Sequence, residues 1–245
     1  MNSDDIKLAA ELIRESNRTV AFTGAGISVE SGIPPFRGEG GLWSKYDPIF
    51  LDINYFKMNP NESWVLIKEI FYDYFGQAKP NGAHTSLARM EQDGQLQSII
   101  TQNIDNLHFD AGSREVYEFH GNSRQLICQR CNNRMPVKEF DLKTLPPRCP
   151  QCDSVLKPDF IFFGEGIPEP ANSNSFAEIH RADVFILIGT SGEIMPASLI
   201  PFEAQKMGKK IIEINIEPSN YTSISDVFLQ GKASEVMERL VGELN

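Results

Sequence analysis

The stretch VAFTGAGISVESGIPPFRG, residues 20–38, begins like a dinucleotide-binding fingerprint. Its short apolar run ends in a tight turn with Gly24 and Gly26, which can lie against a pyrophosphate. The third glycine of the pattern G-x-G-x-x-G would fall at position 29, where the chain has Val29. A loop rich in Pro and Gly that carries Arg37 then replaces the usual helix. The stretch therefore predicts the phosphate-binding start of a nucleotide site, joined to a loop with a different task.

The composition is that of a globular protein with an acidic surface. The 245 residues carry a formal net charge of −10. No apolar run reaches the length of a membrane span, and the N-terminal sequence MNSDDIKLAAELIRES has acids where a signal peptide has bases. We therefore expect a cytoplasmic protein that does not bind membranes. The charge argues against direct nucleic-acid binding and suits lysine-rich partners, or it serves solubility alone.

Short apolar segments typical of strands alternate with amphipathic helical segments. We predict strands at 19–23, 97–101, 116–119, 160–163, 184–188 and 210–214, and helices at 3–16, 62–75, 82–92, 171–180, 197–207 and 233–243. Residues 38–60 are rich in Gly, Pro, Asn and Asp and are expected to form a mobile loop. The alternation predicts an α/β fold: a Rossmann-like, doubly wound parallel sheet with helices on both faces.

Distinctive polar sequences follow five of the predicted strands. They are TGAG after the first strand, TQNID after IIT, HG after YEF, GTS after ILI, and Asn215 after IEI. In open α/β sheets, ligands bind outside the carboxyl ends of the strands. Five such ends that meet at one edge of the sheet predict a shared ligand site.

All four cysteines lie in one segment, as two C-x-x-C pairs: Cys128, Cys131, Cys149 and Cys152. Each pair projects two thiolates from a tight turn, and two pairs make a tetrahedral four-sulfur site. We expect structural Zn²⁺, because four protein ligands leave no open position for chemistry. Iron in a rubredoxin-like site, two disulfides and free thiols are the alternatives. The metal would hold together a small lobe at 122–157 that interrupts the α/β pattern.

His120 is the candidate general base, because it ends a predicted strand at the edge where the polar sequences converge. Asn103 and Asp105 follow a neighbouring strand and can hold an amide and a ribose or position a water molecule. No Ser-His-Asp order stands out, so we expect no covalent protein nucleophile. The remaining histidines have expected roles outside the chemistry: structural for His84, hydrogen bonding behind the site for His108, and capping or surface exposure for His180.

Together these sequences resemble the sirtuin family of NAD-dependent protein lysine deacylases. The matching motifs are GAGIS-x-x-SGIP-x-FRG (24–38), TQNID-x-LH (101–108), EFHGN (118–122), the two C-x-x-C pairs, KPDFIFFGE (157–165), GTS-x-x-x-x-PA (189–197) and EIN (213–215). They follow the family's order and span nearly the whole chain. The resemblance explains the opening stretch, because a sirtuin breaks the bond between nicotinamide and ribose and needs a flexible loop over the reacting sugar.

The resemblance implies NAD as a co-substrate and assigns residues to it. The implied contacts are Gly24, Ala25, Gly26, Phe36, Arg37, Gln102, Asn103, Ile104, Asp105, Gly189, Thr190, Ser191, Asn215, Ile216 and Ala233. Within this set, Asn215 and Ile216 would hold the adenosine ribose, and Ala233 would lie near the adenine. The implied catalytic residues are His120, Asn103 and Asp105.

The resemblance also implies the reaction. The acyl-lysine carbonyl oxygen attacks C1′ of the nicotinamide ribose and nicotinamide leaves; His120 then takes a proton through the ribose hydroxyls. The substrate protein or peptide is expected as an extended strand beside Phe163, Gly164, Glu165, Gly166 and Ile194. We expect a monomeric enzyme. ADP-ribosyl transfer, NAD hydrolysis and non-catalytic NAD sensing are the competing functions.

Two features depart from the family's pattern. Pro35 stands where many sirtuins carry an acidic residue or threonine, and it stiffens the loop. Lys68 and Phe71 stand where members that prefer malonyl or succinyl groups have a Tyr-x-x-Arg pair. Without that arginine a buried acyl carboxylate would lack a bidentate partner, so we predict acetyl or longer uncharged acyl groups.

We expect residues 1–245 to form a single catalytic domain with two lobes. The large lobe would comprise about residues 1–37, 77–121 and 158–245. The cofactor loop and a helical insert would occupy about residues 38–76, and the zinc-binding lobe about residues 122–157.

Overall fold

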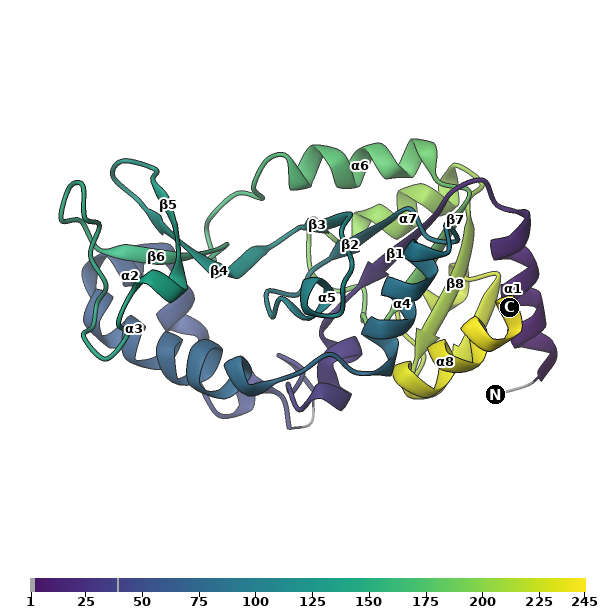
Figure 1. The fold of residues 1–245 in the computed structure, drawn as a ribbon, viewed down its shortest axis with the longest axis horizontal. Coiled ribbons are helices and arrows are strands. Elements are labelled where there is room, and N and C mark those ends of the chain that lie inside the picture. Colours follow the sequence, from purple (N-terminus) through teal and green to yellow (C-terminus); the bar gives the residue numbers. More distant parts are fainter. Residues whose placement is uncertain (1–2, 39) are drawn as a thin grey trace.

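The computed structural model describes residues 3–38 and 40–245 and arranges them in two lobes that lie side by side (Figure 1). Residues 1–2 of the expected large lobe and residue 39 of the expected loop lie outside this description. The large lobe is built on a six-stranded parallel sheet. Its strands, in spatial order, are β3 (Val116–Glu118), β2 (Ser98–Thr101), β1 (Thr19–Thr23), β7 (Val184–Ile188), β8 (Lys210–Asn215) and β9 (Val227–Gln230).

The order of the strands reverses between β1 and β7. The chain runs outward from β1 through β2 to β3 on one side, and β7 to β9 extend the sheet on the other side. Such a reversal leaves a crevice at the carboxyl ends of the two central strands, where ligands of doubly wound folds bind. The fold therefore positions a site where β1 and β7 end.

Helices cover both faces of the sheet, as the apolar sequence of the strands predicts. Successive side chains of a strand point to opposite faces, so Ala21 belongs to one core cluster and Phe22 to another. On the Ala21 face lie α1 (Ser3–Glu15), α4 (Gly82–Gln92) and α8 (Ala233–Leu244), and on the Phe22 face lie α6 (Ala171–Arg181) and α7 (Leu199–Lys206). The predicted doubly wound, Rossmann-like α/β fold is confirmed.

The second lobe combines a small sheet with a helical insert. The segment that contains the sheet, residues 121–160, is called the cysteine lobe below and forms one half of this second lobe. Its strands are antiparallel, in the order β5 (Arg134–Pro136), β4 (Gly121–Cys128) and β6 (Leu156–Phe160). The helical insert (residues 42–77) contains 3-10 turns at Leu42–Ser44 and Pro48–Leu51, α2 (Ile53–Met58), α3 (Pro60–Ile67), a π-helix at Lys68–Tyr74 and a last 3-10 turn at Phe75–Gln77.

The helical insert and the cysteine lobe share one hydrophobic core. Trp64 of α3 is fully buried, and its indole N–H donates a hydrogen bond to the carbonyl oxygen of Leu156 at 2.8 Å. The same cluster contains Ile67 and Phe71 of the insert together with Leu126 of β4. The two segments therefore form a single packed body, although more than forty residues of the large lobe separate them in the sequence.

Four predictions of local structure were wrong. The strand predicted at 160–163 is not in the main sheet: β6 ends at Phe160 and pairs antiparallel with β4. The sixth parallel strand, β9, was missed because its four residues lie close to the chain's last helix. Part of the predicted loop at 38–60 is helical, since Asp52 caps α2 by accepting hydrogen bonds from two backbone N–H groups. The sequence of the predicted helix 62–75 also places Tyr74 on one apolar side with Trp64 and Phe71. In the structure Tyr74 is exposed and Phe75 is buried, because the π-helix at Lys68–Tyr74 shifts the apolar face.

Candidate active site

The glycine turn after β1 meets a second glycine turn after β7. The Gly26 N–H donates to the carbonyl oxygen of Gly189 at 2.8 Å, and the Gly24 N–H donates to Ile188 at 3.0 Å. A Cβ atom on Gly26 would lie 2.6 Å from the Gly189 Cα, and Gly189 has a φ of +60°. The two turns can approach this closely only without side chains. Their contact brings the predicted residues Gly24, Gly26 and Gly189 together at the switch point.

Asn103 and Asp105 form a buried polar network with Ser28. The Asn103 side-chain amide donates to the Gly24 carbonyl oxygen at 3.1 Å and to Ser28 Oγ at 3.2 Å. Ser28 Oγ donates to Asp105 Oδ2 at 2.6 Å, and the Leu107 N–H donates to Asp105 Oδ1 at 3.0 Å. Burial raises the pKa of Asp105, and the hydrogen bonds from Ser28 and Leu107 oppose this shift. The network fixes an acidic group directly behind the glycine turn.

Two buried histidines, His84 and His108, extend this network. The sequence analysis did not predict that their side chains lie next to each other. His84 accepts from the Asn81 N–H at 3.3 Å through Nδ1 and lies 3.5 Å from Ser28 Oγ through Nε2. His108 Nε2 lies 2.9 Å from Thr23 Oγ1, and the ring centroids of His84 and His108 are 5.0 Å apart. Burial lowers the pKa of His84 to about 4, and burial lowers the pKa of His108 as well, helped by His84. Both imidazoles are therefore neutral at pH 7.

Acidification from pH 7 to pH 5 is expected to lower the free energy of unfolding by about 2 kcal/mol through His84 alone. The folded-state pKa of about 4 lies below the ordinary 6.5, so the unfolded chain takes up the proton first. The loss therefore develops as the pH falls from 6.5 towards 4, and His108 adds to it. Urea unfolding at both pH values checks this. His84→Gln should make the free energy of unfolding less dependent on pH, whereas His180→Gln, at an exposed position, should not. An equal pH dependence in the wild type and both variants would contradict the prediction.

His120 follows β3 and turns its imidazole towards the same crevice. Its Nδ1 lies 2.9 Å from the carbonyl oxygen of Gln102, which can only accept, so Nδ1 carries the proton. Nε2 is then the basic nitrogen, and no hydrogen bond ties it to the part of the chain that the structure describes. Burial lowers the pKa of His120, and the bond to Gln102 opposes this shift. This leaves a neutral base with a fixed tautomer at pH 7.

Gln102 also connects the base to the other half of the sheet. Its side-chain amide donates to Thr190 Oγ1 at 3.0 Å, and the Asn215 amide donates to the Thr190 carbonyl oxygen at 3.2 Å. The polar ends of β2, β7 and β8 are thus joined by hydrogen bonds. The five strand-end sequences meet at one edge of the sheet, as predicted.

Four of the remaining predicted NAD contacts, Phe36, Arg37, Ile216 and Ala233, lie around this network, and the Ile216 N–H donates to Asn215 Oδ1 at 3.0 Å. Phe36 packs against Trp43, with ring centroids 5.3 Å apart, and the Arg37 side chain is exposed. Ile216 is also exposed, whereas Ala233 is buried at the start of α8. The Ser234 N–H ties α8 to the glycine-turn segment by donating to Glu30. Sequence reasoning did not assign Ser28 a role, although this serine stands in the GAGIS motif.

A buried lysine holds the segment predicted to bind the substrate peptide. Lys157 is 3% exposed; its Nζ donates to the carbonyl oxygens of Pro158 and Phe160 and lies 3.0 Å from Glu165 Oε2. The same Glu165 oxygen accepts from the Phe162 N–H at 2.7 Å. Burial lowers the pKa of Lys157, and Glu165 opposes this shift. All three ammonium protons thus serve to fold the turn that ends at Glu165.

The peptide segment lies between the base and the helical insert. The Ile161 N–H donates to the His120 carbonyl oxygen at 2.9 Å. The Phe163 N–H donates to the Leu51 carbonyl oxygen at 2.8 Å, and the Ile53 N–H donates to the Phe163 carbonyl oxygen at 3.1 Å, while Phe163 as a whole residue is 47% exposed. On the opposing loop, Ile194 is half-buried and accepts from the Ser198 N–H at 2.8 Å. The backbone of Phe163 already has a partner along one edge.

Replacing Lys157 with methionine is expected to raise the KM for an acyl-peptide about tenfold and to leave the KM for NAD within about twofold. The ammonium loses its contact with Glu165, and the turn that faces the peptide loosens. Steady-state kinetics with each substrate varied in turn measures both values, and Glu165→Gln should act in the same direction. A lowered melting temperature with both KM values unchanged would assign Lys157 to folding alone.

The four cysteine sulfurs lie within 4.8 Å of one another and form no disulfide. Sγ–Sγ distances are 3.4 Å for Cys128–Cys152, 3.6 Å for Cys131–Cys149 and 3.8 Å for Cys131–Cys152. A tetrahedron of sulfurs about 2.3 Å from Zn²⁺ has edges of about 3.8 Å. The donor set therefore fits structural zinc.

Across residues 3–38 and 40–245, no helix combines the length and the apolar character needed to cross a bilayer.

Comparisons with known proteins agree on one family. The model of the Sir2 family matches residues 24–196. An NAD-dependent protein deacylase of Pyrococcus furiosus is 44% identical over an alignment of 245 positions, which spans 96% of this chain and 96% of that protein. NAD-dependent protein deacetylase 1 of Pyrobaculum aerophilum is 41% identical and covers 99% of this chain and 96% of its own.

Solved structures give the same result. A Sir2 homolog–NAD complex superposes with a TM-score of 0.89 at 40% identity, over 97% of this chain and 93% of that one. A Sir2–p53 peptide–NAD⁺ complex has a TM-score of 0.89 at 35% identity, over 97% and 98%. With the motifs, the sheet and the site all matching, the chain belongs to the Sir2 family.

Proposed function

We propose that this protein is an NAD-dependent protein lysine deacylase, which cleaves NAD to nicotinamide and transfers the acyl group of a lysine side chain to ADP-ribose. The observation that carries the proposal is the orientation of His120. Its Nδ1 is held by Gln102, its Nε2 is free to accept a proton, and burial keeps its pKa below the ordinary value. Relatives named as NAD-dependent deacylases and deacetylases support it.

NAD would lie across the switch point between β1 and β7. The phosphates are assigned to Gly24, Ala25, Gly26, Gly189, Thr190 and Ser191; the nicotinamide ribose to Phe36, Arg37, Gln102, Asn103, Ile104 and Asp105; and the adenosine to Asn215, Ile216 and Ala233. The N–H groups of Gly24, Gly26 and Gly189 already donate to backbone carbonyl oxygens. The N–H groups of Ala25, Thr190 and Ser191 and the hydroxyls of Thr190 and Ser191 are the donors that suit an anion. Asn103 and Asp105, already locked by Ser28, suit an amide and sugar hydroxyls.

The proposed reaction begins with attack of the acyl-lysine carbonyl oxygen on C1′ of the ribose, and the bond from C1′ to nicotinamide breaks. His120 Nε2 then accepts a proton through the ribose hydroxyls, and one hydroxyl oxygen attacks the acyl carbon. Water completes the transfer, which frees the lysine and leaves the acyl group on ADP-ribose. The protein contributes positioning and the exclusion of water, because an amide oxygen is a weak nucleophile.

The peptide would bind as an extended strand between Phe163–Gly166 and the loop that contains Ile194. Since one edge of Phe163 is paired with the insert and the Glu165 N–H donates to the Phe162 carbonyl oxygen at 3.0 Å, the peptide would use the other backbone groups of Gly164 to Gly166. Lys68 donates to Asp73 at 2.6 and 2.7 Å and is therefore engaged away from an acyl tail. This supports acetyl and longer uncharged acyl groups over malonyl and succinyl.

Zinc would be held by Cys128, Cys131, Cys149 and Cys152, and it would supply structure rather than chemistry. In this proposal, residues 1–37, 77–121 and 158–245 bind NAD. Residues 38–76 close over the site and contact the substrate, and residues 122–157 hold the metal. The proposal also includes a cytoplasmic location and a monomeric state. The acidic composition supports the absence of direct nucleic-acid binding.

Mass spectrometry of an acetyl-lysine peptide incubated with NAD tests the function. Free peptide, nicotinamide and O-acetyl-ADP-ribose in equal amounts are expected. Nicotinamide release without conversion of the peptide would overturn the proposal in favour of NAD hydrolysis. A mass gain of one ADP-ribose on a protein would favour ADP-ribosyl transfer instead.

A further inference from the structure

The loop that follows β7 carries an acidic side chain that the reaction does not use. Glu193 precedes Ile194, which the proposed function places next to the substrate peptide. Glu193 is exposed, and no hydrogen bond or ion pair engages its carboxylate within residues 3–38 and 40–245. A carboxylate in this state is available to a cationic group of a ligand.

The loop around Glu193 is anchored at both ends by Tyr221. Gly192 has a φ of +76°, and a Cβ atom there would lie 2.9 Å from the Tyr221 ring. Tyr221 is fully buried, and its hydroxyl donates to the Ser198 carbonyl oxygen at 3.3 Å. The position of Glu193 is therefore fixed before a peptide binds, which lowers the entropy cost of any contact it makes.

The backbone of Glu193 is also free, whereas the carbonyl groups on either side of it are engaged. The Gly192 carbonyl oxygen accepts from the Asn220 side-chain amide at 3.4 Å, and the Ile194 carbonyl oxygen accepts from the Ser198 N–H at 2.8 Å. In the described part of the chain, neither the N–H nor the carbonyl oxygen of Glu193 has a hydrogen-bond partner. Because paired and unpaired residues alternate along the edge of a sheet, Glu193 is the residue of this loop that suits pairing with an added strand.

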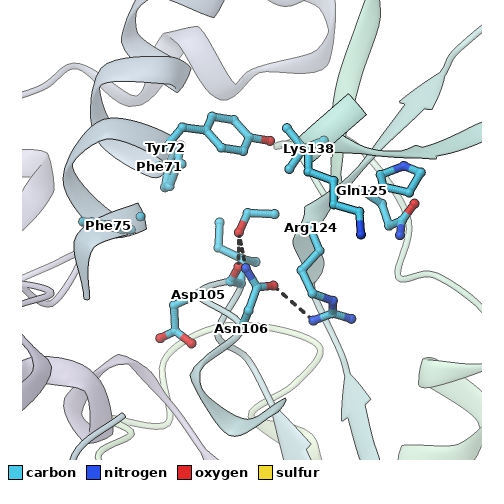
Figure 2. A pocket seen from close by; sticks show the side chains of 13 residues that line it. Phe71, Tyr72, Phe75, Asp105, Asn106, Arg124, Gln125 and Lys138 are labelled. Atoms are coloured by element: carbon cyan, nitrogen blue, oxygen red, sulfur yellow. Dashed lines mark hydrogen bonds between the residues drawn. The ribbon is translucent and has the colours of Figure 1, made fainter. Parts of the chain in front are cut away.

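The reacting lysine and the Glu193 carboxylate belong to different sides of the peptide. A cavity of about 450 Å³ between the helical insert and the cysteine lobe is lined by Phe71, Asp105 and Arg124, among others (Figure 2). Its lining, within the described chain, includes no residue of the loop 191–195. The acyl-lysine points inward to reach the ribose assigned to Asp105, and successive side chains of an extended strand point to opposite sides. The exposed Glu193 therefore meets the side chain immediately before or after the acyl-lysine.

The surroundings of Glu193 favour a long basic side chain. Met195 is 62% exposed and offers apolar surface to the methylene groups of a lysine or arginine. The other segment assigned to the peptide contains Glu165, whose carboxylate already lies 3.0 Å from the ammonium of Lys157. Of the two acidic residues in these segments, Glu193 is thus the one that is free to bind a cation.

Resting on the proposed deacylase function, we propose that Glu193 selects substrates with a lysine or arginine immediately beside the acyl-lysine. The carboxylate pairs with the ammonium or guanidinium group, and Met195 covers the stem of the basic side chain. Basic segments of proteins are therefore the preferred substrates, and an acidic residue at the same position is repelled. Because the ion pair is exposed, its effect is modest and is screened by salt.

The test uses acetyl-lysine peptides of one sequence that carry arginine, alanine or glutamate immediately before or immediately after the acetyl-lysine. With the wild-type protein, kcat/KM at one of these positions should be about fivefold higher for arginine than for alanine, and about twentyfold higher for arginine than for glutamate. In about 1 M salt most of this preference should disappear, because the Debye length falls to about 3 Å.

Three variants separate local pairing from the acidity of the whole surface. Glu193→Gln should bring the arginine, alanine and glutamate peptides within about twofold of one another, and Glu193→Lys should favour glutamate over arginine. Glu11→Gln makes the same change of net charge at an exposed position of α1, at the end of the large lobe away from the second lobe (Figure 1). It should keep the wild-type preference.

Each result decides the question. Equal values for arginine and glutamate in the wild type, or a preference that persists in Glu193→Gln, would overturn the inference. A lower KM for NAD in Glu193→Gln with unchanged ratios between the peptides would also overturn it, because the carboxylate would then face the cofactor. Failure of every peptide, the alanine peptide included, would instead count against the deacylase itself, so the two failures are distinguishable.

Discussion

Replacing His120 with alanine is expected to lower the rate of O-acyl-ADP-ribose formation about a thousandfold and to leave the fold intact. The reason lies in the hydrogen bond from Nδ1 to the Gln102 carbonyl oxygen, which leaves Nε2 as the basic nitrogen. Alanine removes the only base that we assign to the ribose hydroxyl. The backbone bonds of this position, such as that from the Ile161 N–H, do not need the imidazole.

The variant should separate the two halves of the reaction. Attack by the acyl oxygen precedes the step that needs the base, so exchange of labelled nicotinamide into NAD should persist in the presence of the acyl-peptide. Mass spectrometry of the products and the exchange assay measure the two steps, and circular dichroism checks the fold. The exposed His180→Ala is the matched control. A His120→Ala protein with the wild-type rate of acyl transfer would refute the assigned role.

Replacing Cys128 with serine should lower the melting temperature by about 10 °C, through a loss of about 3 kcal/mol. Cys128 is fully buried at the end of β4, and its sulfur lies 3.4 Å from that of Cys152. Removing one of four thiolates weakens metal binding, and for a small metal-bound lobe the free energy of metal binding is folding free energy.

Zinc content and thermal unfolding measured on the same samples check this expectation. Wild-type protein should bind zinc in a one-to-one ratio, and a chelator should reproduce the effect of Cys128→Ser until zinc is added back. Lys143→Met, on the surface of the same lobe, should unfold like the wild type. A Cys128→Ser protein without zinc but with an unchanged melting temperature would show that the metal does not hold the lobe.

Much of the large lobe could be predicted from local patterns. The strands Thr19–Thr23 and Val184–Ile188 have the predicted bounds, because continuous β-branched and apolar runs suit a sheet buried on both faces. The strand predicted at 160–163 failed for a physical reason. Its residues Phe160 and Phe162 are buried in the core that the helical insert shares with the cysteine lobe, and hydrophobicity alone does not tell which sheet a strand joins.

The candidate site was predictable where it depends on strand ends and was missed where it depends on tertiary contacts. His120 and Asn103 follow strands, so topology alone brings them to one edge. Ser28 joins them only through the fold of the glycine turn, and His84 arrives from the start of α4. The buried Lys157 was missed because its partner Glu165 is distinguished only once the intervening turn is formed.

The core shared by Trp64 and Leu156 has a consequence for motion. Two segments that bury one another cannot move separately, so the helical insert and the cysteine lobe form one rigid body. Opening and closing of the cleft is then a hinge motion of that body against the sheet. The peptide turn at Phe163 and the wall at Phe71 travel with it. The zinc site lies in the cysteine lobe and touches no reacting atom. By holding that lobe together, it also shapes the surface that closes against the sheet.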